Sequence, residues 1–165
     1  MDICHFQIPD TSEDYLRQLR SSLEETGIRL YTLLIDYGDI SSENPARRKS
    51  DIEWMMQWID IAALAGAERV RIIAGDADPA NRTALARSIE SLRFLCDYAS
   101  GKGVRIVTEN FRPLSSSADN CLALLDACGD RLGLIADFGN FKGPQKNTKS
   151  CKRSYPAASR FMQRR

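Results

Sequence analysis

The chain has 165 residues, of which 43% are hydrophobic and 27% are charged, and both values are ordinary for a globular protein in water. No apolar run approaches the roughly 18–20 residues of a membrane helix, and the first residues lack the pattern of a secretory signal. The cysteines are odd in number and form no CxxC pair, so we expect reduced thiols in a cytoplasmic protein; they are Cys4, Cys96, Cys121, Cys128 and Cys151.

The net charge of +1 conceals an uneven distribution of charge along the chain. Residues 1–141 hold 15 Lys and Arg against 22 Asp and Glu, whereas residues 142–165 hold 8 Lys and Arg and no acid. The last segment also lacks the periodicity of a helix or a strand. We therefore expect residues 147–165 to be a basic irregular tail. Nucleic-acid binding by this tail is a minor alternative, because nothing else here resembles a nucleic-acid module.

In chain order, short apolar runs alternate with longer amphipathic segments. A strand is expected over residues 2–8, followed by a helix from about Ser12 to Thr26. Further strands are expected over 29–36, 69–74, 104–108 and 132–136, with a helix before each of the last three. Ser50 and Glu53 form a capping-box pattern near the start of the second helix, and Asp78–Pro79 suits the start of the third. Five strands and four helices in strict alternation predict an α/β fold.

Four of these strands share one plan: a glycine, an arginine two or three residues later, an apolar run and then a carboxylate. The carboxylates are Asp36, Asp76, Glu109 and Asp137. In a series of βα units the parallel strands end on one side, so these acids would point at a common place. No strand is followed by a GxGxxG fingerprint, which disfavours a doubly wound nucleotide-binding sheet. Since a closed barrel takes about 250 residues, we predict a partial (β/α) barrel of about five parallel strands.

The last two strands carry a more specific pattern. One strand ends in Thr108–Glu109–Asn110, and the next ends in Asp137, followed by Asn140 and Lys142. The segment around these motifs resembles the middle of a xylose-isomerase-like TIM barrel of the sugar phosphate isomerase/epimerase family. Residues 46–75 resemble its third helix and fourth strand. The resemblance covers roughly residues 2–146, so residues 1–146 are expected to form one incomplete barrel domain.

The resemblance implies a divalent metal at the barrel mouth, held by a Glu, an Asp, a His and a last Glu from successive strands. Glu109 matches the first ligand and Asp137 the second, and oxygen-rich ligation suits Mn²⁺ or Mg²⁺. The metal would polarise the substrate carbonyl, and Glu109 would also move the proton next to it as acid and base. Substrate contacts are expected from Asn140, Asn110, Lys142 and His5. Asn140 departs from the family, which commonly has a histidine there.

Simpler interpretations compete with some of these roles. Asp36, Asp76 and Asp78 are expected to be helix caps or loop residues. His5, the only histidine, could line the cleft or be a hydrogen-bonded structural residue. The arginines that begin the strands should be solvated at the end opposite the site; they are Arg29, Arg69, Arg105 and Arg131. Trp54 and Trp58 are expected to pack in the core.

The histidine and the last glutamate of the implied ligand set have no match after Lys146. A shifted reading frame could encode an acidic amphipathic helix and a strand ending His-Ala-Lys instead of the tail. Our hypothesis is therefore that residues 147–165 are translated out of frame and that the domain is truncated at both ends. The codon sequence of the gene would test this hypothesis.

Three functional interpretations follow. The first is a metal-dependent sugar or sugar phosphate isomerase/epimerase, represented here by an inactive fragment that binds metal weakly or not at all. The second is an endonuclease-IV-like DNA repair barrel, which a single histidine disfavours. The third is a non-catalytic relic with a basic binding tail. The sheet edges left open by a partial barrel are expected to favour self-association.

Overall fold

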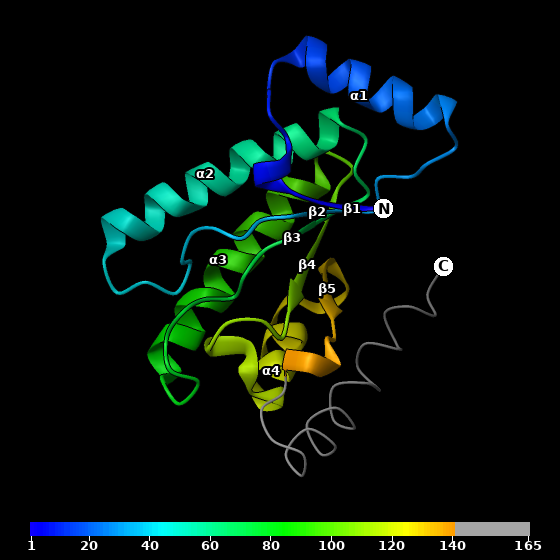
Figure 1. The fold of residues 1–165 in the computed structure, drawn as a ribbon. Helices are drawn as coiled ribbons and strands as arrows, with labels where there is room; N and C mark the ends of the chain where they lie inside the picture. Colours follow the sequence, from blue (N-terminus) through cyan, green and yellow to red (C-terminus); the bar gives the residue numbers. More distant parts are fainter. Residues whose placement is uncertain (141–165) are drawn as a thin grey trace.

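The computed structural model describes residues 1–140. Within them, five strands alternate with four α-helices (Figure 1). The strands are β1 (Asp2–Cys4), β2 (Thr32–Leu34), β3 (Arg69–Arg71), β4 (Arg105–Glu109) and β5 (Leu132–Ile135). The helices are α1 (Glu13–Glu25), α2 (Pro45–Leu64), α3 (Arg82–Ser100) and α4 (Ala118–Cys128). The alternation expected from the sequence is therefore confirmed.

All neighbouring strands are parallel, and their spatial order β1-β2-β3-β4-β5 equals their order in the chain. A doubly wound sheet reverses its strand order at a switch point, whereas a barrel adds each strand beside the previous one. The sequential order is thus that of a partial (β/α) barrel, as predicted. Among the described residues the outer strands β1 and β5 have one neighbour each. Self-association through these edges stays a prediction.

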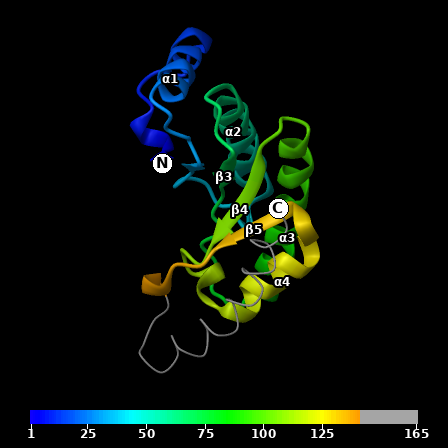
Figure 2. The same ribbon diagram turned by 90° about the vertical axis from the view of Figure 1, so that its right-hand side faces the viewer.

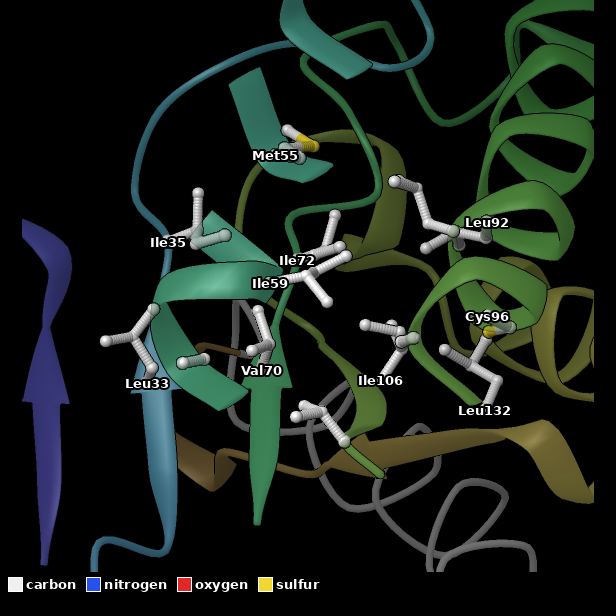
Figure 3. Packing of buried hydrophobic residues seen from close by; sticks show 14 of the residues in the cluster. Leu33, Ile35, Met55, Ile59, Val70, Ile72, Leu92, Cys96, Ile106 and Leu132 are labelled. Atoms are coloured by element: carbon white, nitrogen blue, oxygen red, sulfur yellow. The ribbon is translucent and has the colours of Figure 1, made fainter. Parts of the chain in front are cut away.

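The hydrophobic core lies between the sheet and the helices that cover one of its faces (Figures 1 and 2). Alternate residues in the strands and directly after them, such as Leu33, Val70, Ile72 and Ile106, point toward α2 and α3 and are almost fully buried (Figure 3). Because strand side chains alternate between faces, the intervening residues point to the other face. In the barrel, this second face is the interior and leads to the mouth at the carboxyl ends of the strands.

Two of the three helix starts discussed above were placed wrongly. Ser12 does cap α1, since its Oγ accepts the Tyr15 N–H at 3.4 Å. However, α2 begins at Pro45, and the Asn44 side chain caps it by accepting the Ala46 and Arg47 N–H groups. The capping-box pattern at Ser50 therefore lies inside this helix.

The helix α3 likewise begins later than expected, at Arg82, because Asn81 accepts the Ala84 N–H and caps it. Asp78 instead accepts the Ala80 N–H at 2.8 Å and stabilises a turn before the helix. In both loops an asparagine caps the helix, although a nearby sequence pattern is also typical of a helix start. None of the helices among the described residues combines the length and hydrophobicity needed to span a bilayer.

Candidate active site

Glu109 and Asp137 lie at the carboxyl ends of neighbouring parallel strands. Glu109 is the last residue of β4 and pairs in register with Ile135 of β5, and Asp137 follows two residues later. The side chain of Glu109 is 14% exposed. Asp137 is exposed, and its Oδ1 accepts the Gly139 N–H at 2.7 Å. The structure thus brings together the two residues expected to bind metal.

Asn110 fixes the backbone of Asp137. Its Nδ2 donates to the Asp137 carbonyl at 2.7 Å, and its Oδ1 accepts the Asp137 N–H at 2.7 Å. Asn110 is itself 1% exposed, so its amide cannot rotate freely in solvent. This double contact makes Asn110 a positioning residue for Asp137. The role in substrate binding that the sequence proposed for it stays a prediction.

Arg71 is the main residue at this site that sequence reasoning missed. It ends β3, its side chain is only 5% exposed, and it lies between two carboxylates. Its Nη1 is 2.6 Å from Asp36 Oδ1 and donates to the Ile35 carbonyl at 2.9 Å. Its Nε is 3.2 Å from Glu109 Oε2. Asp36 lies in the loop after β2, as expected from the sequence, and in addition it is an ion-pair partner of Arg71.

A signal for Arg71 was present in the sequence but was overlooked. Arg71 stands within an otherwise apolar strand run, two residues after Arg69. In the structure it shares a row across the sheet with Leu34, Val107 and Gly133. A buried arginine requires charged partners. Its presence inside a strand thus indicated acids on the neighbouring strands.

The environment of Glu109 raises the pKa of its carboxyl group. Burial has the largest effect, and Asp137 and Asp36 add to it because like charges disfavour ionisation. Arg71 and the hydrogen bond from Asn140 act in the opposite direction. Asn140 Nδ2 donates to Glu109 Oε1 at 3.3 Å. One carboxylate thus receives opposing influences from four neighbouring side chains, an arrangement typical of functional sites.

His5 follows the edge strand β1 and belongs to an aromatic cluster beside the mouth. Its ring meets the rings of Trp54 and Trp58 edge to face, at centroid distances of 5.2 and 5.4 Å. Its Nδ1 accepts the Asp36 N–H at 3.4 Å. Trp54 also contacts Tyr37, which is 57% exposed. His5 therefore has structural contacts, and its proposed contact with substrate is not tested by them. Lys142 lies outside the described residues, as does the basic tail.

The arginines that begin the strands lie at the opposite end of the sheet, as expected. Arg29 pairs with Glu68, and Arg131 pairs with Asp97. The Arg69 guanidinium lies 4.0 Å from the Tyr31 ring centre. These side chains have partners at the rim opposite Glu109.

The donor set at the mouth fits a hard divalent cation. Carboxylate oxygens are the ligands that Mg²⁺ and Mn²⁺ prefer, and Glu109 and Asp137 lie at the carboxyl ends of neighbouring strands. Within residues 1–140, however, no group of three or more His, Cys, Asp or Glu side chains is arranged to hold a metal. The described residues therefore supply two ligands, and the adjacent Arg71 offsets part of their negative charge.

Comparisons with known proteins agree with the fold described above. A family model described as xylose isomerase-like TIM barrel matches residues 1–156. Similar solved structures include an L-ribulose 3-epimerase, with a TM-score of 0.73, 22% identity, and coverage of 84% of this chain and 50% of that chain. A 3-keto-D-glucoside 4-epimerase from E. coli has a TM-score of 0.71 at 14% identity, with coverage of 87% and 62%. No curated protein matches the sequence.

A third similar structure is a D-psicose 3-epimerase with D-tagatose from Clostridium cellulolyticum H10, with a TM-score of 0.73, 15% identity, and coverage of 90% of this chain and 58% of that chain. This chain thus spans between 50% and 62% of the length of these three structures. At such low identities the likeness shows the fold alone. Because the family model covers most of the sequence, the chain belongs to the xylose isomerase-like TIM barrel family.

Proposed function

We propose that the described residues form part of the active site of a divalent-metal-dependent sugar isomerase or epimerase. The observation that carries this proposal is the placement of Glu109 and Asp137 at the ends of adjacent strands. Asn110 holds one of them from the backbone, and Arg71 and Asn140 contact the other. The similar solved structures are described as sugar epimerases, which supports this choice of chemistry.

In this proposal Glu109 and Asp137 hold Mn²⁺ or Mg²⁺, which when bound supplies Lewis-acid polarisation of the substrate carbonyl. Glu109 would accept the proton from the carbon next to that carbonyl. Isomerisation then requires this proton to be delivered to the neighbouring carbon, and epimerisation requires a proton to be delivered to the opposite face of the same carbon. In the metal-free chain, burial and the neighbouring carboxylates raise the pKa of this carboxyl group. Arg71 and Asn140 hold the carboxylate in one orientation while it exchanges the proton.

The substrate would be a sugar or a sugar phosphate. Asn140 lies at the mouth and already donates to Glu109, so its amide could also reach a substrate hydroxyl. His5 could contribute through its Nε2, because its Nδ1 accepts the Asp36 N–H. Lys142 is proposed as a further substrate contact from the sequence pattern alone.

Two protein carboxylates hold these cations weakly, because water must complete the coordination shell. We therefore propose that this chain binds Mn²⁺ with a dissociation constant in the millimolar range and shows no sugar turnover by itself. The first statement can be tested directly on the chain as it exists.

The test is titration with Mn²⁺, followed by the enhanced relaxation of water protons. The wild-type chain should bind one ion weakly, and Glu109→Gln and Asp137→Asn should each abolish this binding. Glu53→Gln is the matched control, because Glu53 lies on α2, where it forms an exposed ion pair with Lys49 at 3.8 Å. If Glu109→Gln binds Mn²⁺ as well as the wild type does, the metal site lies elsewhere and the proposal fails.

A further inference from the structure

Arg112 has the most unusual backbone of the described residues. Its φ of 68° makes it the one residue other than glycine with a positive φ between residues 1 and 140. This region is unfavourable for a residue with a Cβ. Pro113 follows, and a proline restricts the preceding residue to extended conformations. Such strain persists where surrounding contacts impose it, and it occurs often at functional sites.

The contacts that hold Arg112 come from the loop after β3. Its Nη1 lies 3.2 Å from Asp76 Oδ1, and its guanidinium lies 5.6 Å from the Phe111 ring centre. The Leu114 N–H donates to the Gly75 carbonyl at 3.3 Å, which joins the two loops through their backbones. Arg112 is thus fixed by its side chain and by the residues that follow it.

Asp76 is positioned equally firmly. Its N–H donates to Oδ1 of the buried Asp39 at 3.4 Å. Gly75 before it has a φ of 144° and packs so closely on Ser41 that a Cβ would overlap the serine hydroxyl. The carboxylate of Asp76 is therefore held by a loop with little freedom to adjust.

This pair lies on the same rim as the proposed metal site. Arg112 follows Glu109 by three residues, which places the two Cα atoms within about 11 Å of each other. The Phe111 ring between them in sequence also contacts Arg71, whose guanidinium is 5.4 Å from the ring centre. The side chains of Asp76 and Arg112 are both 40% exposed, so each can still meet a ligand.

We infer that Asp76 and Arg112 form a pair that hydrogen-bonds to hydroxyl groups of the sugar distant from the reacting carbon. This inference rests on the proposed function and specifies its substrate. The guanidinium offers several N–H donors and the carboxylate offers acceptors, which match a hydroxyl that both donates and accepts. Asp76 offsets the charge of Arg112, so a neutral sugar suits this pair better than a phosphate ester does.

The experiment uses the full chain with Mg²⁺ and measures binding of D-fructose and D-fructose 6-phosphate by saturation-transfer NMR. Arg112→Ala, Arg112→Gly and Asp76→Asn should each weaken fructose binding about ten-fold, the effect of losing one or two hydrogen bonds to charged groups. Mg²⁺ binding should be unchanged. Arg17→Ala, which removes an exposed ion-paired arginine of α1, should leave both unchanged.

The two substitutions at Arg112 also separate recognition from stability. A glycine variant of a protein is normally less stable than the alanine variant at the same position. At a φ of 68° this order should reverse, so Arg112→Gly should unfold at a higher temperature than Arg112→Ala. Both variants should lose fructose binding equally, because both lack the guanidinium. If both variants lose fructose binding equally although their stabilities differ, the loss is due to the missing Arg112 side chain.

The inference fails if Arg112→Ala binds fructose like the wild type, or if Arg112→Ala weakens the phosphate ester more than fructose. In either case Mg²⁺ binding that depends on Glu109 would leave the proposed function intact. If the wild-type chain binds neither Mg²⁺ nor fructose, the proposed function and this inference fail together.

Discussion

The two ends of the parallel sheet carry the same kinds of charged residue in different surroundings. At the amino ends of the strands, Arg29 and Arg131 pair with acids while 68% and 43% of their side chains stay exposed. At the carboxyl ends, Arg71 is 5% exposed and contacts Asp36 and Glu109. Charge patterns along the sequence are thus similar at both rims, and burial distinguishes them.

Burial changes what an ion pair does. An exposed pair contributes little, because water solvates its members equally well when they are apart. A buried pair holds its members strongly, since removing one leaves the other charged and desolvated. The carboxyl rim therefore provides fixed carboxylates, among which burial raises the pKa of Glu109, and the amino rim provides a more solvated surface. This difference explains why the candidate active site lies at only one end.

Replacing Arg71 should cause the largest loss of stability, and it tests the difference between the two rims of the sheet most directly. Arg71→Met leaves Asp36 and Glu109 without their shared cation, so unfolding in urea should show a loss of about 3–5 kcal/mol. Arg29→Met at the other rim should cost at most about 1 kcal/mol. Equal losses in the two variants would mean that the two rims do not differ energetically.

Removing the amide of Asn110 should have a smaller effect on stability but a specific effect on metal. Asn110→Ala frees the backbone of Asp137, and residues that orient a metal ligand typically contribute about ten-fold or more to affinity. The two unpaired backbone groups should cost about 1–3 kcal/mol. Water-proton relaxation with Mn²⁺ and urea unfolding measure the two effects.

Asn120 provides the matched control for this prediction. It is also 1% exposed, and its Nδ2 donates to the carbonyls of Pro79 and Leu114. Asn120→Ala should therefore destabilise the chain to a similar degree without changing Mn²⁺ binding. If both variants lower metal affinity alike, Asn110 acts through general stability and does not position Asp137.

The sequence allowed the architecture to be predicted because the strands and helices repeat in a regular pattern. Glu109 was placed correctly at the end of β4, and Asp137 was placed correctly just after the neighbouring strand β5. That result follows from topology, since parallel strands end on the same side. It did not require knowledge of any side-chain contact.

Residues that depend on contacts between distant loops were not predictable in the same way. Arg71 acts through strands on both sides, and the Asp76–Arg112 pair joins segments 36 residues apart. The helix starts at Pro45 and Arg82 were missed for a local reason, because several capping patterns compete within each loop. The capping preference of a single residue does not decide which of these patterns starts the helix.

The smallest expected effect concerns the half-exposed pair of Asp60 and Lys102, which belongs to the amino rim because Lys102 lies three residues before the first residue of β4. Lys102 Nζ is 2.9 Å from Asp60 Oδ1, and the Tyr98 hydroxyl donates to Oδ2 at 2.8 Å. Burial alone would raise the pKa of Asp60, but these hydrogen bonds and the charge of Lys102 lower it overall. The folded state thus binds this proton less tightly than the unfolded state.

The pair should therefore stabilise the fold above the ordinary aspartate pKa of 3.8, and its contribution should vanish as the pH falls through the lowered value. Because both side chains are about two-fifths exposed, the contribution at neutral pH should stay below about 1 kcal/mol. Urea unfolding of the wild type and Asp60→Asn between pH 7 and pH 3 measures it. The two curves should converge in acid. The difference should already be smaller at pH 3 than at pH 7. A difference of the same size at both pH values would show that Asp60 acts through packing and not through its charge.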